Sequence, residues 1–197
     1  MAFFGITFAV TWAAWFSAPL VDAPGAGGHS AAWTLLIYVG TFAPGITAVA
    51  MSAAEGRDVL RDLLRRLVKA DAAPRLYLFA VMYLFALKLL NAAIQRAAFG
   101  EWPVIATQPF PLLLVATFFS TVIGGQAGEE LGWRGFALPR LASRMGYAWA
   151  GVLVGVAWAL WHLPLFLIPG ADKTGQSFPV WALGVVALSV AMTWLWV

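Results

Sequence analysis

Two adjacent glutamates and an arginine end an apolar run in the segment GQAGEELGWRGFALPR, residues 125–140. Ionised side chains are costly next to hydrocarbon, so their presence within a membrane segment indicates a function. On a helix, Glu130 and Arg134 lie four residues apart with the acid first, which is the favoured order for an ion pair. Glu129 is turned about 100° away from Glu130, so we expect it not to pair with Arg134 and to be available for chemistry.

The glycines around these acids recur every four residues, at Gly124, Gly128 and Gly132. Such a stripe without side chains lets a second helix approach closely in a membrane. Because Glu129 borders the stripe, we expect its carboxylate to point into a helix bundle. The alternative is that both glutamates are solvated at the cytoplasmic end of the helix, with Arg134 as an interfacial anchor.

The second candidate is His162, in the segment GVLVGVAWALWHLPLFLIPG, residues 151–170. It lies one helical turn after Trp158 and follows another stripe of small residues that includes Gly151 and Gly155. A lone histidine in a span is more often a hydrogen-bonded core residue than a catalyst, because polar side chains also join membrane helices.

A glutamate that meets a histidine inside a protein can activate a water for hydrolysis, either as general bases or by holding a metal ion. Glu129 and His162 therefore predict an intramembrane hydrolase, although they do not identify its substrate. The chain has no cysteine and only two histidines, which excludes thiol catalysis and a metal site built mainly of histidines. Glu129 and His162 remain candidate ligands for a divalent metal such as zinc, whose presence the sequence leaves open.

The composition predicts an integral membrane protein. Hydrophobic residues make up 62% and charged residues 11% of the chain, against about 45–50% and about 25% in soluble domains. We expect an all-α polytopic helix bundle that forms one membrane domain over residues 1–197. About six apolar runs are long enough to cross a bilayer, near residues 3–20, 32–54, 76–99, 110–133, 149–169 and 179–197.

The basic residues are concentrated in two of the connections between these runs. Nine of the twelve fall within residues 55–75 and 134–148, so the positive-inside rule predicts that both termini are cytoplasmic. We expect a multi-pass plasma-membrane protein whose partners are the bilayer and a membrane-associated peptide or protein. The sequence pI near 9.6 is explained by these loops, and no nucleic-acid partner is predicted.

Three further patterns concern the placement of elements. Residues 57–69 predict an amphipathic helix on the membrane surface. Straight helices would place Glu129 and His162 at different depths. We therefore expect the fifth span to begin nearer Leu153, with residues 136–150 along the surface; the alternative is that the fourth helix tilts deep into the bundle. A polar stripe in the third run is predicted to face inward; its members are Lys88, Asn91 and Gln95.

At these motifs the chain resembles the CAAX prenyl protease and bacteriocin-processing (CPBP) intramembrane proteases, also called the type II CAAX endopeptidase or Abi family. The family's first motif, two Glu, three residues and Arg, matches Glu129, Glu130 and Arg134. Its second motif, an aromatic residue followed four positions later by His, matches Trp158 and His162, with Trp in place of the commoner Phe. The similarity covers about residues 110–197 and looks like the bacterial branch.

The resemblance implies an intramembrane endopeptidase of the metallo- or glutamate-type that hydrolyses a CAAX-like prenylated substrate or a peptide precursor. Glu129 and His162 would activate the water, and the pair of Glu130 with Arg134 would shape the site. The alternative is a catalytically silent membrane scaffold or bacteriocin-immunity factor of the same fold. A transporter is disfavoured, because the repeated, broken helices of such folds are missing.

The family's third motif, a His followed four positions later by Asn or Asp, has no match in the chain. The resemblance therefore predicts a chain that lacks one or more C-terminal spans, and leaves the activity of these 197 residues alone open. The absent span is expected to pack against both stripes of small residues.

Overall fold

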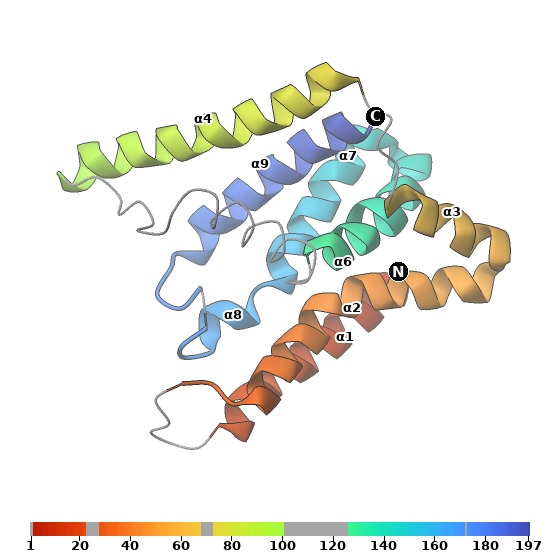
Figure 1. Cartoon of the computed structure of the whole chain (residues 1–197), viewed down its shortest axis with the longest axis horizontal. Coiled ribbons are helices and arrows are strands. Elements are labelled where there is room, and N and C mark those ends of the chain that lie inside the picture. Colours follow the sequence, from red (N-terminus) through yellow and green to blue (C-terminus); the bar gives the residue numbers. More distant parts are fainter. Residues whose placement is uncertain (1, 23–27, 68–72, 101–125, 172) are drawn as a thin grey trace. The chain divides into compact units, whose positions relative to one another are not determined.

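The computed structural model describes residues 2–22, 28–67, 73–100, 126–171 and 173–197, and all secondary structure in these residues is helical (Figure 1). The predicted all-α class is therefore confirmed for the described part of the chain. The elements in order are α1 (Ala2–Ser17), η1 (Ala18–Val21), α2 (Ala31–Glu55), α3 (Arg57–Leu67), α4 (Pro74–Phe99), α6 (Gln126–Glu130), η2 (Leu131–Ala137), α7 (Leu138–Trp161), α8 (Pro164–Leu167) and α9 (Phe178–Trp196).

The described helices fall into two compact units, one formed by residues 1–68 with 118–197 and the other by residues 69–117. The second unit contributes α4, which begins with a proline in its first turn and ends at Gly100 in the left-handed conformation, φ 77°. Helix α4 coincides with the third predicted run. The side-chain surroundings of the predicted polar stripe on α4 lie outside the described residues, as does Gly124.

Four stretches of the described residues are long and apolar enough to cross a bilayer: 2–21, 31–55, 126–167 and 178–196. They correspond to five of the six predicted runs, because the stretch 126–167 joins the fourth and fifth runs through helical structure. The start of the fourth run, residues 110–125, lies outside the described residues.

The joining segment differs from the straight helix that the sequence predicts. Residues Leu131–Ala137 form a π-helix, η2, and π-helical turns are rare and frequently lie at functional sites. The later break in α7 falls at Gly146, where φ is 78° and ψ is 161°, and not near Leu153. The expected surface placement of residues 136–150 is also wrong at its beginning, because Phe136 and Leu138 are buried in the core.

Helix α3 confirms the amphipathic pattern predicted for residues 57–69. Gly56 has φ 135° between α2 and α3, a backbone conformation that favours glycine and lets the chain turn there. Leu63 of α3 is buried and lies where a Cβ on Gly135 would contact it, at 3.1 Å. The exposed face of α3 carries Arg61 and Arg65.

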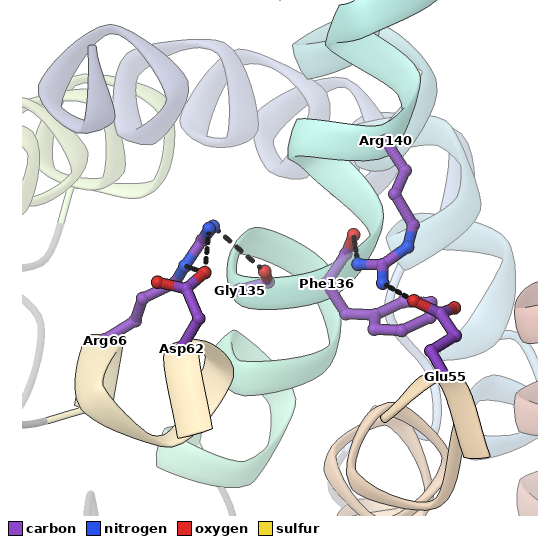
Figure 2. A network of polar contacts seen from close by, with 6 residues as sticks. All are labelled: Glu55, Asp62, Arg66, Gly135, Phe136 and Arg140. Atoms are coloured by element: carbon purple, nitrogen blue, oxygen red, sulfur yellow. Dashed lines mark hydrogen bonds and ion pairs between the residues drawn. The ribbon is translucent and has the colours of Figure 1, made fainter. Parts of the chain in front are cut away.

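Arginines tie α2, α3 and the segment around η2 together (Figure 2). Arg66 Nη1 donates to the carbonyl oxygen of Gly135 at 3.3 Å, and Arg66 Nη2 donates to Asp62 Oδ2 at 2.6 Å. Arg140 Nη2 donates to Glu55 Oε2 at 2.5 Å, and its Nη1 donates to a carbonyl of η2 at 3.2 Å. We call residues 55–67 and 135–144 together the arginine end of the first unit.

The stripes of small residues pack against helices that are present in the chain. A Cβ on Gly132 would lie 2.6 Å from the carbonyl carbon of Pro44 in α2, and a Cβ on Gly155 would lie 2.8 Å from Ser189 Cβ in α9. Ser189 Oγ also donates to the carbonyl oxygen of Gly151 at 2.8 Å. The expectation that both stripes await an absent span is therefore wrong, since they bring α6 and η2 onto α2 and bring α7 onto α9.

The close approach at Gly132 gives a first test. We expect Gly132→Ala to lower the free energy of unfolding by about 1–3 kcal/mol, because the backbone of Pro44 cannot move aside easily. The matched control is Gly184→Ala in α9, where an added Cβ meets nothing within 4 Å and helix propensity favours alanine. Thermal unfolding in detergent measures both variants, and equal midpoints would contradict the packing of η2 on α2.

Candidate active site

The carboxylate of Glu129 is buried, as the glycine stripe predicts. Its side chain belongs to α6, and the residue is 8% exposed. Its Oε2 accepts a hydrogen bond from the indole Nε1 of Trp158 in α7 at 2.9 Å. The alternative of a solvated Glu129 at the helix end is therefore wrong.

The predicted ion pair between Glu130 and Arg134 is confirmed. Arg134 Nη1 donates to Glu130 Oε1 at 2.8 Å, with side chains that are 3% exposed for Arg134 and 32% exposed for Glu130. Arg134 is thus a buried residue of η2 and not an interfacial anchor. The pair links the end of α6 to the π-helix, so it joins the two elements that carry the first motif.

Trp158 also contacts the guanidinium of Arg134. The Cζ atom of Arg134 lies 4.5 Å from the centre of the Trp158 ring system, a cation–π contact that is worth about 0.5–2 kcal/mol depending on burial. The Nε and Nη2 atoms of Arg134 make no hydrogen bond with any residue that the structure describes. Within these residues, the charge of Arg134 is balanced by Glu130 and by the face of Trp158.

His162 follows the last turn of α7, two residues before the proline that begins α8. Its Nδ1 lies 2.9 Å from the carbonyl oxygen of Trp158. Because a carbonyl oxygen only accepts, Nδ1 carries a proton in this contact, and in the neutral ring the lone pair is then on Nε2. The ring packs among aromatic side chains, with centroid distances of 4.5 Å to Trp161 and 4.9 Å to Trp181.

One cavity of about 350 Å³ contains both candidate residues in its wall. Glu129 and His162 thus line one cavity, which the straight helices of the sequence prediction would not allow. Most of the wall is aromatic or aliphatic, which suits an apolar ligand. The polar or charged side chains in the wall are Glu129, His162, Gln126, Thr41 and Lys173.

The sequence patterns assigned no role to Lys173, Gln126 or Thr41. One sequence feature could have singled out Lys173: it is the only basic residue in the three connections outside residues 55–75 and 134–148. Gln126 and Thr41 are single polar residues next to apolar runs, a pattern with no specific meaning.

A second polar cluster, formed by Asp22, His29 and Ser30, lies beside Trp33 of the cavity wall. Trp33 belongs to the wall, and the ring of His29 stacks on it with centroids 3.7 Å apart. Asp22 Oδ2 lies 2.8 Å from His29 Nδ1, and Asp22 Oδ1 accepts from the backbone N–H of Ser30 at 2.9 Å. Hydrogen bonds with Ser30 and then with His29 lower the pKa of Asp22 to about 2, so Asp22 is ionised at neutral pH.

The candidate metal ligands do not form a complete donor set. Catalytic zinc sites use three protein ligands and one water. Within the described ranges, no three His, Cys, Asp or Glu side chains are grouped so that they could hold an ion. Glu129 and His162 supply two donors, so the described residues do not make a complete zinc site.

Comparisons with known proteins identify relatives of this chain. The family model for type II CAAX prenyl endopeptidases, described as Rce1-like, matches residues 109–197. The chain is also 26% identical over 215 residues to CAAX prenyl protease 2 of Methanococcus maripaludis, a match that covers 98% of this chain and 74% of that protein. The resemblance that the motifs indicate is confirmed over residues 109–197, and the bacterial branch stays a prediction.

The ion pair gives a second test, on stability. Arg134→Met leaves Glu130 without its partner, so we expect the free energy of unfolding to fall by about 2 kcal/mol, less than the roughly 3–5 kcal/mol of a fully buried pair because solvent reaches Glu130. Adding Glu130→Gln should restore part of the loss, since no charge is then stranded. Arg65→Met on the exposed face of α3 is the control in the same denaturation assay. An effect of Arg134→Met no larger than that of Arg65→Met would contradict a structural role for the pair.

Proposed function

Because residues 109–197 match the family model of type II CAAX prenyl endopeptidases, we propose that this protein is an intramembrane endopeptidase whose water is activated by Glu129 and His162. Its substrate would be a membrane-associated peptide or protein. The observation that carries the proposal is that both side chains lie in the wall of one largely apolar cavity within the matched region. A peptide bond of an apolar segment could enter such a cavity and leave bulk water behind.

The two residues are arranged as two bases. Oε2 of Glu129 is held by Trp158, and Oε1 is the other acceptor on that carboxylate. The tautomer that places the proton of His162 on Nδ1 makes Nε2 an acceptor as well. A water that donates to both groups would direct its own lone pair at a substrate carbonyl carbon.

The proposed reaction is hydrolysis of a peptide bond. The water oxygen bonds to the carbonyl carbon while one base takes a proton from it, which gives a tetrahedral intermediate. The C–N bond breaks, and the proton passes from the base to the leaving nitrogen. One carboxylic acid and one amine result, and Glu129 and His162 return to their starting states. Lys173 is the cation in the described cavity wall and would favour the negative oxygen of the intermediate.

A second candidate function is a membrane scaffold or immunity factor that binds a peptide without cleaving it. The observation in its favour is that the described residues bring together two catalytic candidates and no third acid, histidine or cysteine that could complete a metal site. In that case the apolar cavity would bind an apolar segment and no turnover would occur.

Cleavage of peptides by the purified protein in detergent tests the proposal. The probe is a mixture of a farnesylated peptide ending in a CAAX sequence and unmodified apolar peptides, with products identified by mass spectrometry. We expect the wild type to cleave at least one peptide, and Glu129→Gln to reduce the rate by about 100-fold or more, because it removes a base at nearly constant volume. Trp158→Phe keeps an aromatic ring and loses the donor to Glu129, so a smaller fall of about tenfold is expected.

Glu55→Gln is the control, because it removes a carboxylate of the arginine end that does not line the cavity. Its rate should equal that of the wild type. Full activity in Glu129→Gln would end the assignment of Glu129 as a base, and no cleavage by the folded wild type would favour the scaffold.

A further inference from the structure

A second cavity, of about 370 Å³, adjoins the segment that carries the first motif. Ala127 and Glu130 belong to its wall, whereas Gln126 and Glu129 belong to the wall of the candidate active site. The remaining described wall comes from the end of α3, from η2 and from the last turns of α9, all within the first unit. The apolar side chains among these are Leu67, Leu131, Met192, Leu195 and Trp196. The proposed hydrolysis gives this cavity no role.

Arg66 brings a guanidinium group with available N–H groups to this cavity. A guanidinium has five N–H groups. Arg66 donates from Nε and Nη2 to Asp62 Oδ2, at 3.1 and 2.6 Å, and from Nη1 to the carbonyl oxygen of Gly135 at 3.3 Å (Figure 2). One N–H on Nη1 and one on Nη2 therefore have no acceptor among the described residues. Because the other bonds hold the guanidinium in place, it is already oriented for an anionic oxygen.

Arg134 adds a second guanidinium group to the wall. The residue is 2% exposed, and its Nη1 donates to Glu130 Oε1. Its Nε and Nη2 have no hydrogen-bond partner in the described part of the chain, so a nearby negative charge would stabilise this buried cation. The described wall thus holds two guanidinium groups and one carboxylate. These charges favour an anionic occupant over a cationic one.

The cavity lies at the depth where lipid headgroups meet the hydrocarbon. Helix α9 is long and apolar enough to span a bilayer, and the cavity includes Met192, Leu195 and Trp196 from its last turns. Helix α3 has four arginines and two aspartates in its 11 residues, so it is too polar to cross the membrane and lies at the surface. An occupant would therefore have its polar part beside Arg66 and its apolar part along α9.

From these observations we propose that the second cavity binds an anionic phospholipid of the surrounding bilayer. Its phosphate accepts hydrogen bonds from Arg66, because a guanidinium matches the geometry of phosphate oxygens. The beginning of an acyl chain lies against Leu195 and Met192, an apolar wall that a free phosphate ion would leave unused. The cavity is at the small end of the roughly 300–1,000 Å³ of ligand pockets, so the rest of the lipid stays in the bilayer. This site is independent of the proposed function, and a lipid-modified substrate can still bind at Glu129.

Thermal unfolding in lipid nanodiscs tests the site. Discs of phosphatidylcholine are compared with discs that also contain phosphatidylglycerol, a phospholipid with a net negative charge. We expect phosphatidylglycerol to raise the unfolding midpoint of the wild type by about 5 °C, because a ligand that binds only the folded state stabilises it. Glycerol phosphate, which has the head without the chains, should give no shift. The absence of a shift with phosphatidylglycerol, or an equal shift with glycerol phosphate, would overturn the proposal.

Matched variants separate this cavity from a general attraction of the basic surface to anionic lipid. Arg66→Met and Arg65→Met each remove one positive charge from α3, but Arg65 is exposed and does not line this cavity. We expect Arg66→Met to lose most of the lipid-dependent shift and Arg65→Met to keep it. Leu195→Trp fills the apolar part of the cavity without a change of charge, so it should also lose the shift. Equal losses in the two arginine variants, or a full shift in Leu195→Trp, would contradict a specific site.

Each shift is measured against the same variant in phosphatidylcholine, so a variant that is less stable still gives a valid result. Native mass spectrometry then identifies the lipid, and we expect phosphatidylglycerol to remain bound to the wild type and to be lost from Arg66→Met. A farnesylated CAAX peptide in excess should leave this lipid in place, because Glu129 and His162 lie in the other cavity. Displacement of the lipid would assign the second cavity to the substrate and overturn the proposal. Lipid binding is measured without turnover, so a failure of the proposed function does not affect this result.

Discussion

The site depends on the contacts of one residue, Trp158. Its indole N–H donates to Glu129, the face of its ring contacts the guanidinium of Arg134, and its carbonyl oxygen accepts from His162. A buried charge or polar group without partners is strongly destabilising, so these contacts make it possible to keep a carboxylate, a guanidinium and an imidazole together among apolar side chains. Trp158 thereby couples the two sequence motifs, which come from different helices.

This arrangement requires helices that approach more closely than ordinary side chains allow. A Cβ on Gly45 of α2 would lie 2.6 Å from the carbonyl oxygen of Gly128, so α2 fixes the position of α6 and thus of Glu129. On the other side, Gly151 and Gly155 fix α7 against α9 and thus place His162 beside Trp181. Because interiors are packed to fixed densities, the stability of the fold and the geometry of the site rest on the same glycines.

Features that depend on local spacing could be predicted from the sequence. The pair of Glu130 with Arg134 and the inward direction of Glu129 both result from helical phase, and two motifs in order were enough to indicate the family. The predicted partner of the glycine stripes, an absent span, is wrong. A stripe of small residues predicts that another helix approaches closely, but it does not specify which helix that is. The sequence also does not predict the π-helix, because over so short a segment the hydrophobic periodicity of a π-helix cannot be distinguished from that of an α-helix. One sequence feature points to the hydrogen bond from Trp158 to Glu129: position 158 is a Trp, which has an N–H donor, where the family more often has Phe.

The most direct test of the role of Trp158 is the NMR signal of its indole Nε1–H in protein labelled with ¹⁵N-tryptophan, assigned among the eleven tryptophans by its loss in Trp158→Phe. A hydrogen bond to a carboxylate shifts such a signal downfield and slows its exchange with water. Glu129→Met removes the acceptor at similar volume, and Glu55→Gln removes a distant carboxylate as control. If Glu129 holds Trp158, the signal moves upfield and exchanges faster in Glu129→Met and is unchanged in Glu55→Gln. A signal with the same position and exchange rate in Glu129→Met as in the wild type would show that the two residues do not interact.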